Sequence, residues 1–134
     1  MKAWLLLLVL GAPLAGQSSL GEAAEQARRA WLAHDAAALV AHSPSLVLQI
    51  PGADPSSPLG RAQAAELLSR YFRPTEERGT AVGAVREVEP GRGFVELERR
   101  YVVAGTRDER RETVFLGFRL LLGRWVLAEL RSEP

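Results

Sequence analysis

The sequence contains no cysteine, a single lysine (Lys2) and only two histidines (His34 and His42). Without cysteine the chain forms no disulfide, offers no thiolate to a metal and has no cysteine nucleophile. Two histidines are too few for a histidine-rich zinc site, so we expect no bound metal and no cofactor. The 134 residues suffice for one domain with a real core and contain no internal repeat.

An excess of positive charge is also missing. Lys and Arg number 17 against 16 Asp and Glu, which gives a net charge of +1. Removal of Lys2 with the N-terminus would bring the side-chain charge to about zero. A nucleic-acid-binding surface needs a concentrated basic excess, so we expect no nucleic-acid partner. The use of arginine in place of lysine is compatible with anion binding or with the codon bias of a GC-rich genome.

The first 17 residues have the layout of a secretory signal peptide. The basic residue Lys2 precedes the apolar run Ala3–Leu10, and small residues then lead to a cleavage point between Ala15 and Ser18. The run is shorter than the roughly 20 residues of a spanning helix, although an uncleaved anchor is the alternative. We expect residues 18–134 to form one exported domain, secreted or periplasmic in a bacterium, with no membrane contact after signal cleavage.

Hydrophobic periodicity predicts three helices and five strands after the signal segment. A two-residue loop of Gly123-Arg124, suited to a type II′ turn, is expected to join the last two strands. The charged stretches Thr75–Gly79 and Arg107–Glu112 are interpreted as connections. The order predicts an α+β fold with helices packed on a curved antiparallel sheet. The elements are the helices Leu20–Ala33, Ala36–His42 and Gly60–Phe72 and the strands Ser45–Ile50, Thr80–Glu89, Phe94–Ala104, Glu112–Leu122 and Trp125–Ser132.

Four segments in this order resemble the nuclear-transport-factor-two-like superfamily, which includes ketosteroid isomerases and SnoaL-type cyclases. They are Ala30–Val40, Ser45–Gly52, Leu59–Phe72 and Gly123–Arg131. The resemblance covers about Leu20 to Ser132 and is nearest to small exported bacterial domains of unknown function. It implies a cone-shaped, cystatin-like α+β barrel in the order helix, helix, strand, helix and four strands. It gives a fold and not an activity.

The residues that the isomerases use for catalysis have no counterpart here. In those enzymes a carboxylate base lies near the end of the first strand, where this chain has Gln49 or Ile50. Neither side chain can take up a proton at neutral pH. The residues around Trp31 offer no match to the helix tyrosine that serves as oxyanion donor. We therefore expect no catalytic residues of that type and favour a non-catalytic domain over an enzyme.

Arg99 is the residue most suggestive of a binding site. Alternation along its strand places it with Val95, Leu97 and Tyr101 on the face that should line the cone. A buried arginine needs an acid, an anionic ligand or several carbonyls. One interpretation is a pocket for an anionic small molecule, and the other is a structural ion pair with Glu129 or Glu87. The candidate pocket residues are Trp31, Gln49, Tyr71, Arg99 and Tyr101.

The last two strands should carry apolar residues on both faces. Val126, Ala128 and Leu130 alternate with Trp125 and Leu127. A sheet that is apolar on both faces is covered on both faces. The helices can cover one face, and a second subunit is the simplest cover for the other. We therefore expect a homodimer through the C-terminal sheet, a mode that is common in the family it resembles.

Three functions stay open at this point. The first is non-catalytic binding of a small hydrophobic or anionic ligand in the cone. The second is a SnoaL- or isomerase-like enzyme with an atypical polar site. The third is a protein-interaction module whose cone is filled by side chains.

Overall fold

The computed structural model describes residues 19–134, so the predicted signal peptide lies outside the described residues. The order helix, helix, strand, helix and four strands is confirmed within that range. The elements are α2 (Leu20–Leu32), α3 (Ala36–Leu39), β1 (Val47–Gln49), α4 (Arg61–Phe72), β2 (Thr75–Glu89), β3 (Arg92–Val103), β4 (Glu109–Leu121) and β5 (Arg124–Glu133). None of these helices is long and apolar enough to cross a membrane.

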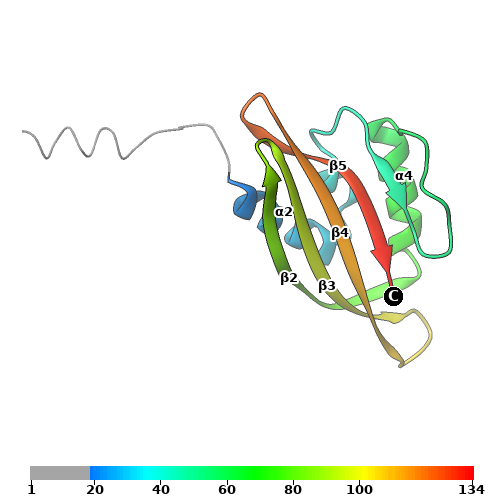
Figure 1. Cartoon of the computed structure of the whole chain (residues 1–134). Coiled ribbons are helices and arrows are strands. Elements are labelled where there is room, and N and C mark those ends of the chain that lie inside the picture. The colour runs from blue at the N-terminus through cyan, green and yellow to red at the C-terminus, as the bar shows by residue number, and fades with distance from the viewer. Residues whose placement is uncertain (1–18) are drawn as a thin grey trace, which may run out of the picture.

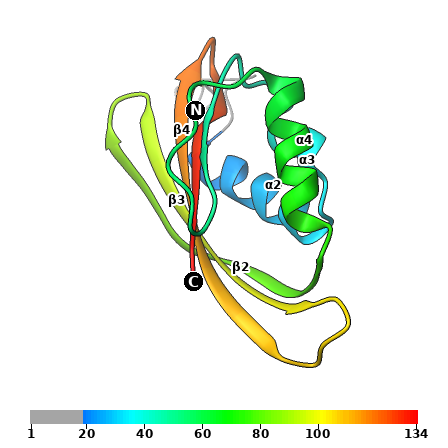
Figure 2. The same cartoon turned by 90° about the vertical axis from the view of Figure 1, so that its right-hand side faces the viewer.

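The five strands form one curved sheet in the order β1-β5-β4-β3-β2, and it is not closed into a barrel. Strands β2 to β5 are an antiparallel meander, as short connections favour. Strand β1 departs from the purely antiparallel prediction, because it pairs in parallel with β5 after the α2–α3 segment. The helices pack against the concave face and leave the outer face uncovered (Figures 1 and 2).

Helix α2 crosses the concave face, and local signals fix both of its ends. The Ser19 hydroxyl accepts a hydrogen bond from the Glu22 amide, and the Glu22 carboxylate accepts one from Ser19, which is a capping box. At the other end the chain turns at His34, whose φ is 54°. Helix and sheet approach closely at the start of α2. A Cβ on Gly93 would lie 2.5 Å from a methyl carbon of Leu20.

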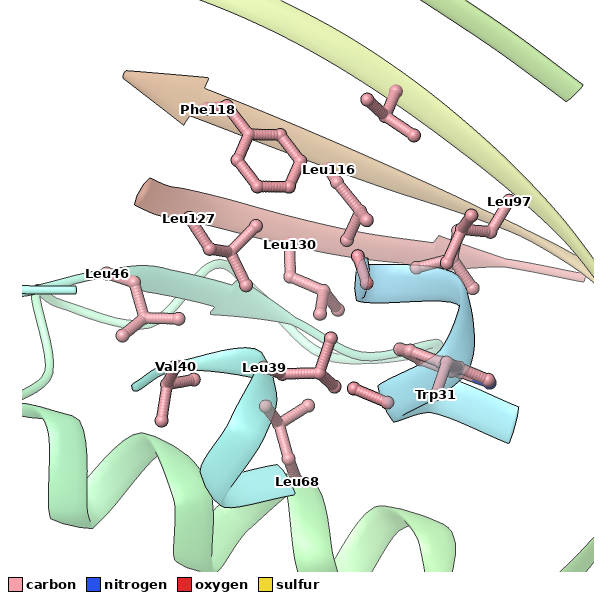
Figure 3. Packing of buried hydrophobic residues seen from close by; sticks show 14 of the residues in the cluster. Trp31, Leu39, Val40, Leu46, Leu68, Leu97, Leu116, Phe118, Leu127 and Leu130 are labelled. Carbon is pink, nitrogen blue, oxygen red and sulfur yellow. The ribbon is translucent and has the colours of Figure 1, made fainter. Parts of the chain in front are cut away.

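One hydrophobic core lies between the helix layer and the sheet (Figure 3). Trp31 from α2 and Leu68 from α4 are fully buried against Leu97 and Leu116 of the sheet. Deleting a buried leucine side chain of this kind typically costs about 2–5 kcal/mol. The core is therefore the main source of stability, and it is built by all three helices and the three central strands.

Bulges set which residues of the sheet face inward. In β5 the register skips Ala128, since Phe118 pairs with Leu127 and Gly117 pairs with Glu129. Leu130 consequently faces the core and is 1% exposed. The predicted grouping of Leu130 with the outward residue Ala128 is wrong, because a bulge adds one residue and reverses the alternation beyond it. Strand β2 has three such irregularities, at Glu77/Gly79, Val82/Ala84 and Glu87/Glu89.

Two predicted connections and one turn differ from the structure. Strand β2 begins at Thr75 and β4 begins at Glu109, so most of each charged stretch belongs to a strand. The β4–β5 turn is Leu122-Gly123 and not Gly123-Arg124, with φ of 51° and 77°. Positive φ at both central residues is the mark of a type I′ turn, which matches the twist of a hairpin, as the predicted type II′ turn also would.

Candidate functional site

Arg99 lies on the inner side of β3, as alternation predicted, and its side chain is 0% exposed. Its Nε donates to Glu77 Oε2 at 3.3 Å. One terminal nitrogen donates to Tyr71 Oη and to Glu112 Oε1, each at 3.2 Å. The other donates to Thr75 Oγ1 at 3.2 Å and forms the ion pair with Glu77. A guanidinium has five N–H donors, and these five contacts engage all of them.

Glu112 is the second carboxylate that Arg99 contacts, and it accepts several other hydrogen bonds. Its carboxylate accepts hydrogen bonds from Tyr71, from Tyr101 at 2.9 Å and from Ser132 at 2.8 Å. Burial alone would raise the pKa of Glu112. The three hydroxyl donors and the Arg99 charge outweigh burial and hold that pKa below its ordinary value of 4.5. Glu112 is thus held ionised in the protein interior.

Aromatic rings surround the guanidinium of Arg99. Its carbon lies 3.9 Å from the ring centroid of Tyr101, 5.3 Å from that of Trp31 and 5.6 Å from that of Tyr71. Desolvated cation–π contacts of this kind are worth about 2 kcal/mol. Burial, followed by the hydrogen bond to Glu112, raises the pKa of Tyr71 far above its ordinary value. The tyrosine therefore stays protonated and remains a donor.

His34 is where this network approaches solvent. Its Nε2 lies 3.0 Å from Glu77 Oε1, and its side chain is 24% exposed. The imidazole stacks on Phe72 with the ring centroids 4.6 Å apart and an interplanar angle of 5°. The ring therefore covers the carboxylate of Glu77, which is only 3% exposed.

We call Arg99, Glu77, Glu112, Tyr71, Tyr101, Ser132, Thr75 and His34 the buried charge network. It brings one permanent cation together with two carboxylates. Its two carboxylates are 3% and 7% exposed, and each is already engaged by the cation. A substrate could reach a carboxylate or the guanidinium only by displacing these contacts. The arrangement therefore resembles a structural ion-pair cluster more than a reaction centre.

Four of the five predicted pocket residues meet at the network, namely Trp31, Tyr71, Arg99 and Tyr101. Gln49 lies elsewhere, in the edge strand β1, where its side chain donates to the Ala53 carbonyl at 3.2 Å. A parallel edge strand on the far side of β5 keeps it away from β3. Whether these residues hold a ligand stays a prediction.

The suggested ion-pair partners of Arg99 are wrong. Glu129 is exposed beside the bulge of β5, and its side chain lies over Gly117. Glu87 accepts a hydrogen bond from the Gly91 amide at the β2–β3 turn. The true partners are Glu77, which lay in a stretch interpreted as a connection, and Glu112, which lay where a charged turn was predicted to lead into a strand. The period of two along Thr75, Glu77 and Gly79 could have indicated a strand that begins here and carries Glu77.

An apolar cleft opens between α2, α3 and the last two strands. Its volume is about 270 Å³. Alanines form much of the helical walls, whereas Phe118, Trp125 and Leu127 form the sheet side. The full lining is Ala23, Gln26, Ala27, Ala38, Leu39, Ala41, His42, Ser43, Phe118, Trp125, Val126 and Leu127. Small side chains leave this space open where larger ones would fill it.

The outer face of the sheet has a second depression, with a volume of about 350 Å³. Arg131 lies with its guanidinium carbon 4.5 Å from the ring centroid of Phe115 at this site. Phe94 continues the apolar floor, and Glu129 adds a negative charge beside Arg131. The lining is Val47, Gln49, Pro55, Phe94, Phe115, Gly117, Glu129, Leu130 and Arg131. We call this depression the outer groove.

No protein-family model matches the chain, and no curated protein matches it. Solved structures match in fold at low identity. A ketosteroid isomerase-like protein from Erwinia carotovora atroseptica has a TM-score of 0.69 at 19% identity, over 86% of this chain and 95% of that one. A DUF4783 family protein from Bacteroides ovatus has a TM-score of 0.64 at 12% identity, over 80% and 90%.

An LEH-like epoxide hydrolase from M. tuberculosis has a TM-score of 0.59 at 17% identity, over 83% of this chain and 78% of that one. Likeness at such identities establishes the fold alone. The chain has the cone-shaped α+β fold of nuclear-transport-factor-two-like proteins, as the resemblance of its four segments implied. The neighbours carry different descriptions, so function has to be argued from the residues of this chain.

Proposed function

We propose that the protein is an exported, non-catalytic binding domain that holds a small apolar molecule in the cleft between α2, α3 and the β4–β5 hairpin. The observation that carries the proposal is the cleft itself. Its volume is about 270 Å³, just below the range typical of sites for drug-sized ligands. A molecule with a short hydrocarbon body would fit this space.

The chemistry of the cleft sets the class of ligand. Four alanines, from α2 and the α3 segment, and three large apolar residues of the sheet line it, and the lining contains no acid and no arginine. Polar groups come from Gln26, His42 and Ser43, and the Ser43 hydroxyl already donates to the Leu127 carbonyl at 2.6 Å. An uncharged molecule with one hydrogen-bonding group suits such a site better than an anion.

The anionic alternative is less well supported. An anion would need free donors, and all five donors of Arg99 are engaged within the buried charge network. The enzyme alternative meets the same obstacle, because Glu77 and Glu112 are buried and paired. The pair of glutamates therefore supports a structural role for this end of the cone.

A titration with 1-octanol tests the proposal. Binding should shift the amide resonances of Ala27 and Trp125 in a nitrogen–proton NMR spectrum of the exported protein. Ala38→Leu would narrow the cleft from an exposed helical position, and we expect it to weaken binding about tenfold or more. Ala37→Leu is the matched control, since Ala37 is exposed in the same helix and does not line the cleft.

Two results would contradict ligand binding in the cleft. One is an absence of shifts at Ala27 and Trp125 at saturating 1-octanol. The other is an equal loss of affinity in Ala38→Leu and Ala37→Leu. Export is checked separately by mass spectrometry of the N-terminus, and an intact Met1 in the exported protein would contradict cleavage.

The outer groove favours a second role, homodimer formation through the sheet. It combines two phenyl rings with both signs of charge, so a second copy could meet Glu129 with its own Arg131. Aromatic residues and arginine are enriched in such interfaces. Light scattering at about micromolar concentration should give twice the chain mass, and Phe115→Ser should halve it. A monomer at that concentration argues against the dimer without affecting the cleft.

A further inference from the structure

The turn between β4 and β5 carries a leucine in an unfavourable place. Leu122 has a φ of 51° and Gly123 has a φ of 77°, with Leu121 and Arg124 paired at the base of the turn. The backbone favours glycine, asparagine or aspartate at both turn positions. A bulky residue at positive φ is a rare outlier. Leu122 therefore stabilises the hairpin less than Asn or Gly would.

Packing among the described residues does not account for this choice. Leu122 is 106% exposed, which means that no part of the described protein covers its side chain. Leu121 beside it is 42% exposed. The β2–β3 turn, in contrast, is made from Pro90 and Gly91, which suit a solvated turn. Within the described residues 19–134 nothing gives the leucines a favourable environment, so such an environment has to come from elsewhere.

Two arginines flank the exposed leucines. Arg119 precedes Leu121 by two residues, and Arg124 pairs with it across the hairpin. Both are exposed, and neither forms an ion pair with any residue of the described range 19–134. The β4–β5 hairpin projects at one end of the sheet (Figure 1). Its tip thus combines an exposed apolar pair with two exposed arginines behind it. An anionic lipid surface is layered in the matching order, with hydrocarbon beneath negative headgroups.

We propose that this hairpin tip contacts a membrane surface bearing anionic lipids. Leu121 and Leu122 enter the boundary between headgroups and acyl chains, and Arg119 and Arg124 lie at the level of the phosphates. A concave protein socket would not require two uncompensated cations beside the leucines, so the lipid surface is favoured. The proposal does not depend on a ligand in the cleft. It departs from the expectation of no membrane contact, which rested on the signal segment alone.

The absence of cysteine from the sequence allows a direct test. A single Leu122→Cys substitution in the exported protein carries a nitrobenzoxadiazole label, whose emission brightens and shifts to the blue in an apolar medium. Leu67→Cys is the matched control, because Leu67 is 39% exposed on α4. Vesicles of phosphatidylglycerol and phosphatidylcholine are compared with vesicles of phosphatidylcholine alone. Emission is a local readout, so it works whether or not the signal segment remains attached.

We expect a blue shift at position 122 with the anionic vesicles and none at position 67. Replacing Arg119 or Arg124 by Gln in the Leu122→Cys background should raise the lipid concentration at half-effect about fivefold for each arginine. Leu122→Asn should raise the unfolding midpoint by about 2–6 °C, because Asn suits the turn. A tip selected only for stability would not forgo that gain.

No shift at position 122 would overturn the proposal. A concave site on a partner protein would then be the alternative cover for the tip. An equal shift at positions 122 and 67 would overturn it as well, since contact would then not be specific to the tip. An equal response to phosphatidylcholine alone would refute the part assigned to Arg119 and Arg124.

Discussion

Removing the cation of the buried charge network should destabilise the protein far more than removing an exposed charge. Arg99→Met keeps the length and the hydrophobic part of the side chain but leaves Glu77 and Glu112 buried without a guanidinium. Breaking a buried pair by removing one partner typically costs about 3–5 kcal/mol. Here one cation serves two carboxylates and three aromatic rings, so we expect the upper half of that range.

The size of this loss can be compared with the stability of the whole domain. A single domain is typically stable by about 5–15 kcal/mol, so the substitution removes about a quarter of that free energy or more. For a chain of this length the midpoint of thermal unfolding should fall by about 10–20 °C. Urea unfolding at low temperature, followed by circular dichroism, measures the free energy directly and does not depend on heating.

Arg100→Met is the matched control on the same strand. The side chain of Arg100 is 47% exposed, and its ion pair with Glu109 spans 3.2 Å at the surface. Exposed pairs of this kind contribute at most about 1 kcal/mol.

Adding Glu112→Gln to Arg99→Met should restore part of the lost stability, because one stranded charge is removed. Coupling within a network of this kind is about 0.5–3 kcal/mol.

The pH dependence of this variant supplies a further check. Protonation of the stranded Glu112 carboxylate in acid removes a buried charge, so the difference between Arg99→Met and the unchanged protein should shrink between pH 7 and pH 4. A loss of unfolding free energy in Arg99→Met no larger than that in Arg100→Met would refute the reasoning. Such a result would mean that the guanidinium and its two carboxylates make no net contribution to folding.

Two further predictions concern Glu112 and the contact of helix α2 with the sheet. The pKa of Glu112 is lowered in the folded protein, so its contribution is fully present above the ordinary value of 4.5 and is lost as pH falls through the folded pKa. Urea titrations from pH 6 to pH 2 should therefore show a shallower loss of stability in Glu112→Gln, and parallel curves would contradict this. Gly93→Ala should cost about 1–3 kcal/mol, because the new Cβ meets Leu20. Combining it with Leu20→Val should recover some of that free energy in the same assay, whereas additive losses would show that the two side chains do not collide.

Much of the architecture could be predicted from local pattern. Helix α2 was placed to within one residue, since an apolar stripe and charge order fix a helix of 13 residues. The inward orientation of Arg99 followed from strict alternation in β3, which has no bulge against β4. Where alternation runs unbroken, the buried face is set by the parity of the residue number.

Only part of the buried charge network could be predicted from the sequence, because its two glutamates escape a local pattern. Glu77 and Glu112 lie at the beginnings of strands, within stretches dense in charge, where composition favours a solvated loop. Their burial depends on a partner in β3 and on hydroxyl groups brought in by α4 and β5, which are distant in sequence. The bulge at Ala128 was likewise invisible, because it arises from pairing between strands and not from the residues of β5 alone.

The irregular register of β2 has a consequence for how the protein behaves when crowded with its own copies. A regular edge strand offers a continuous ladder of free amides and carbonyls on which another chain can polymerise. Three irregularities in 15 residues interrupt that ladder and twist it. At the opposite edge β1 spans only Val47–Gln49, and Pro51 follows two residues later. Both edges of the described sheet are therefore poor templates for fibre growth.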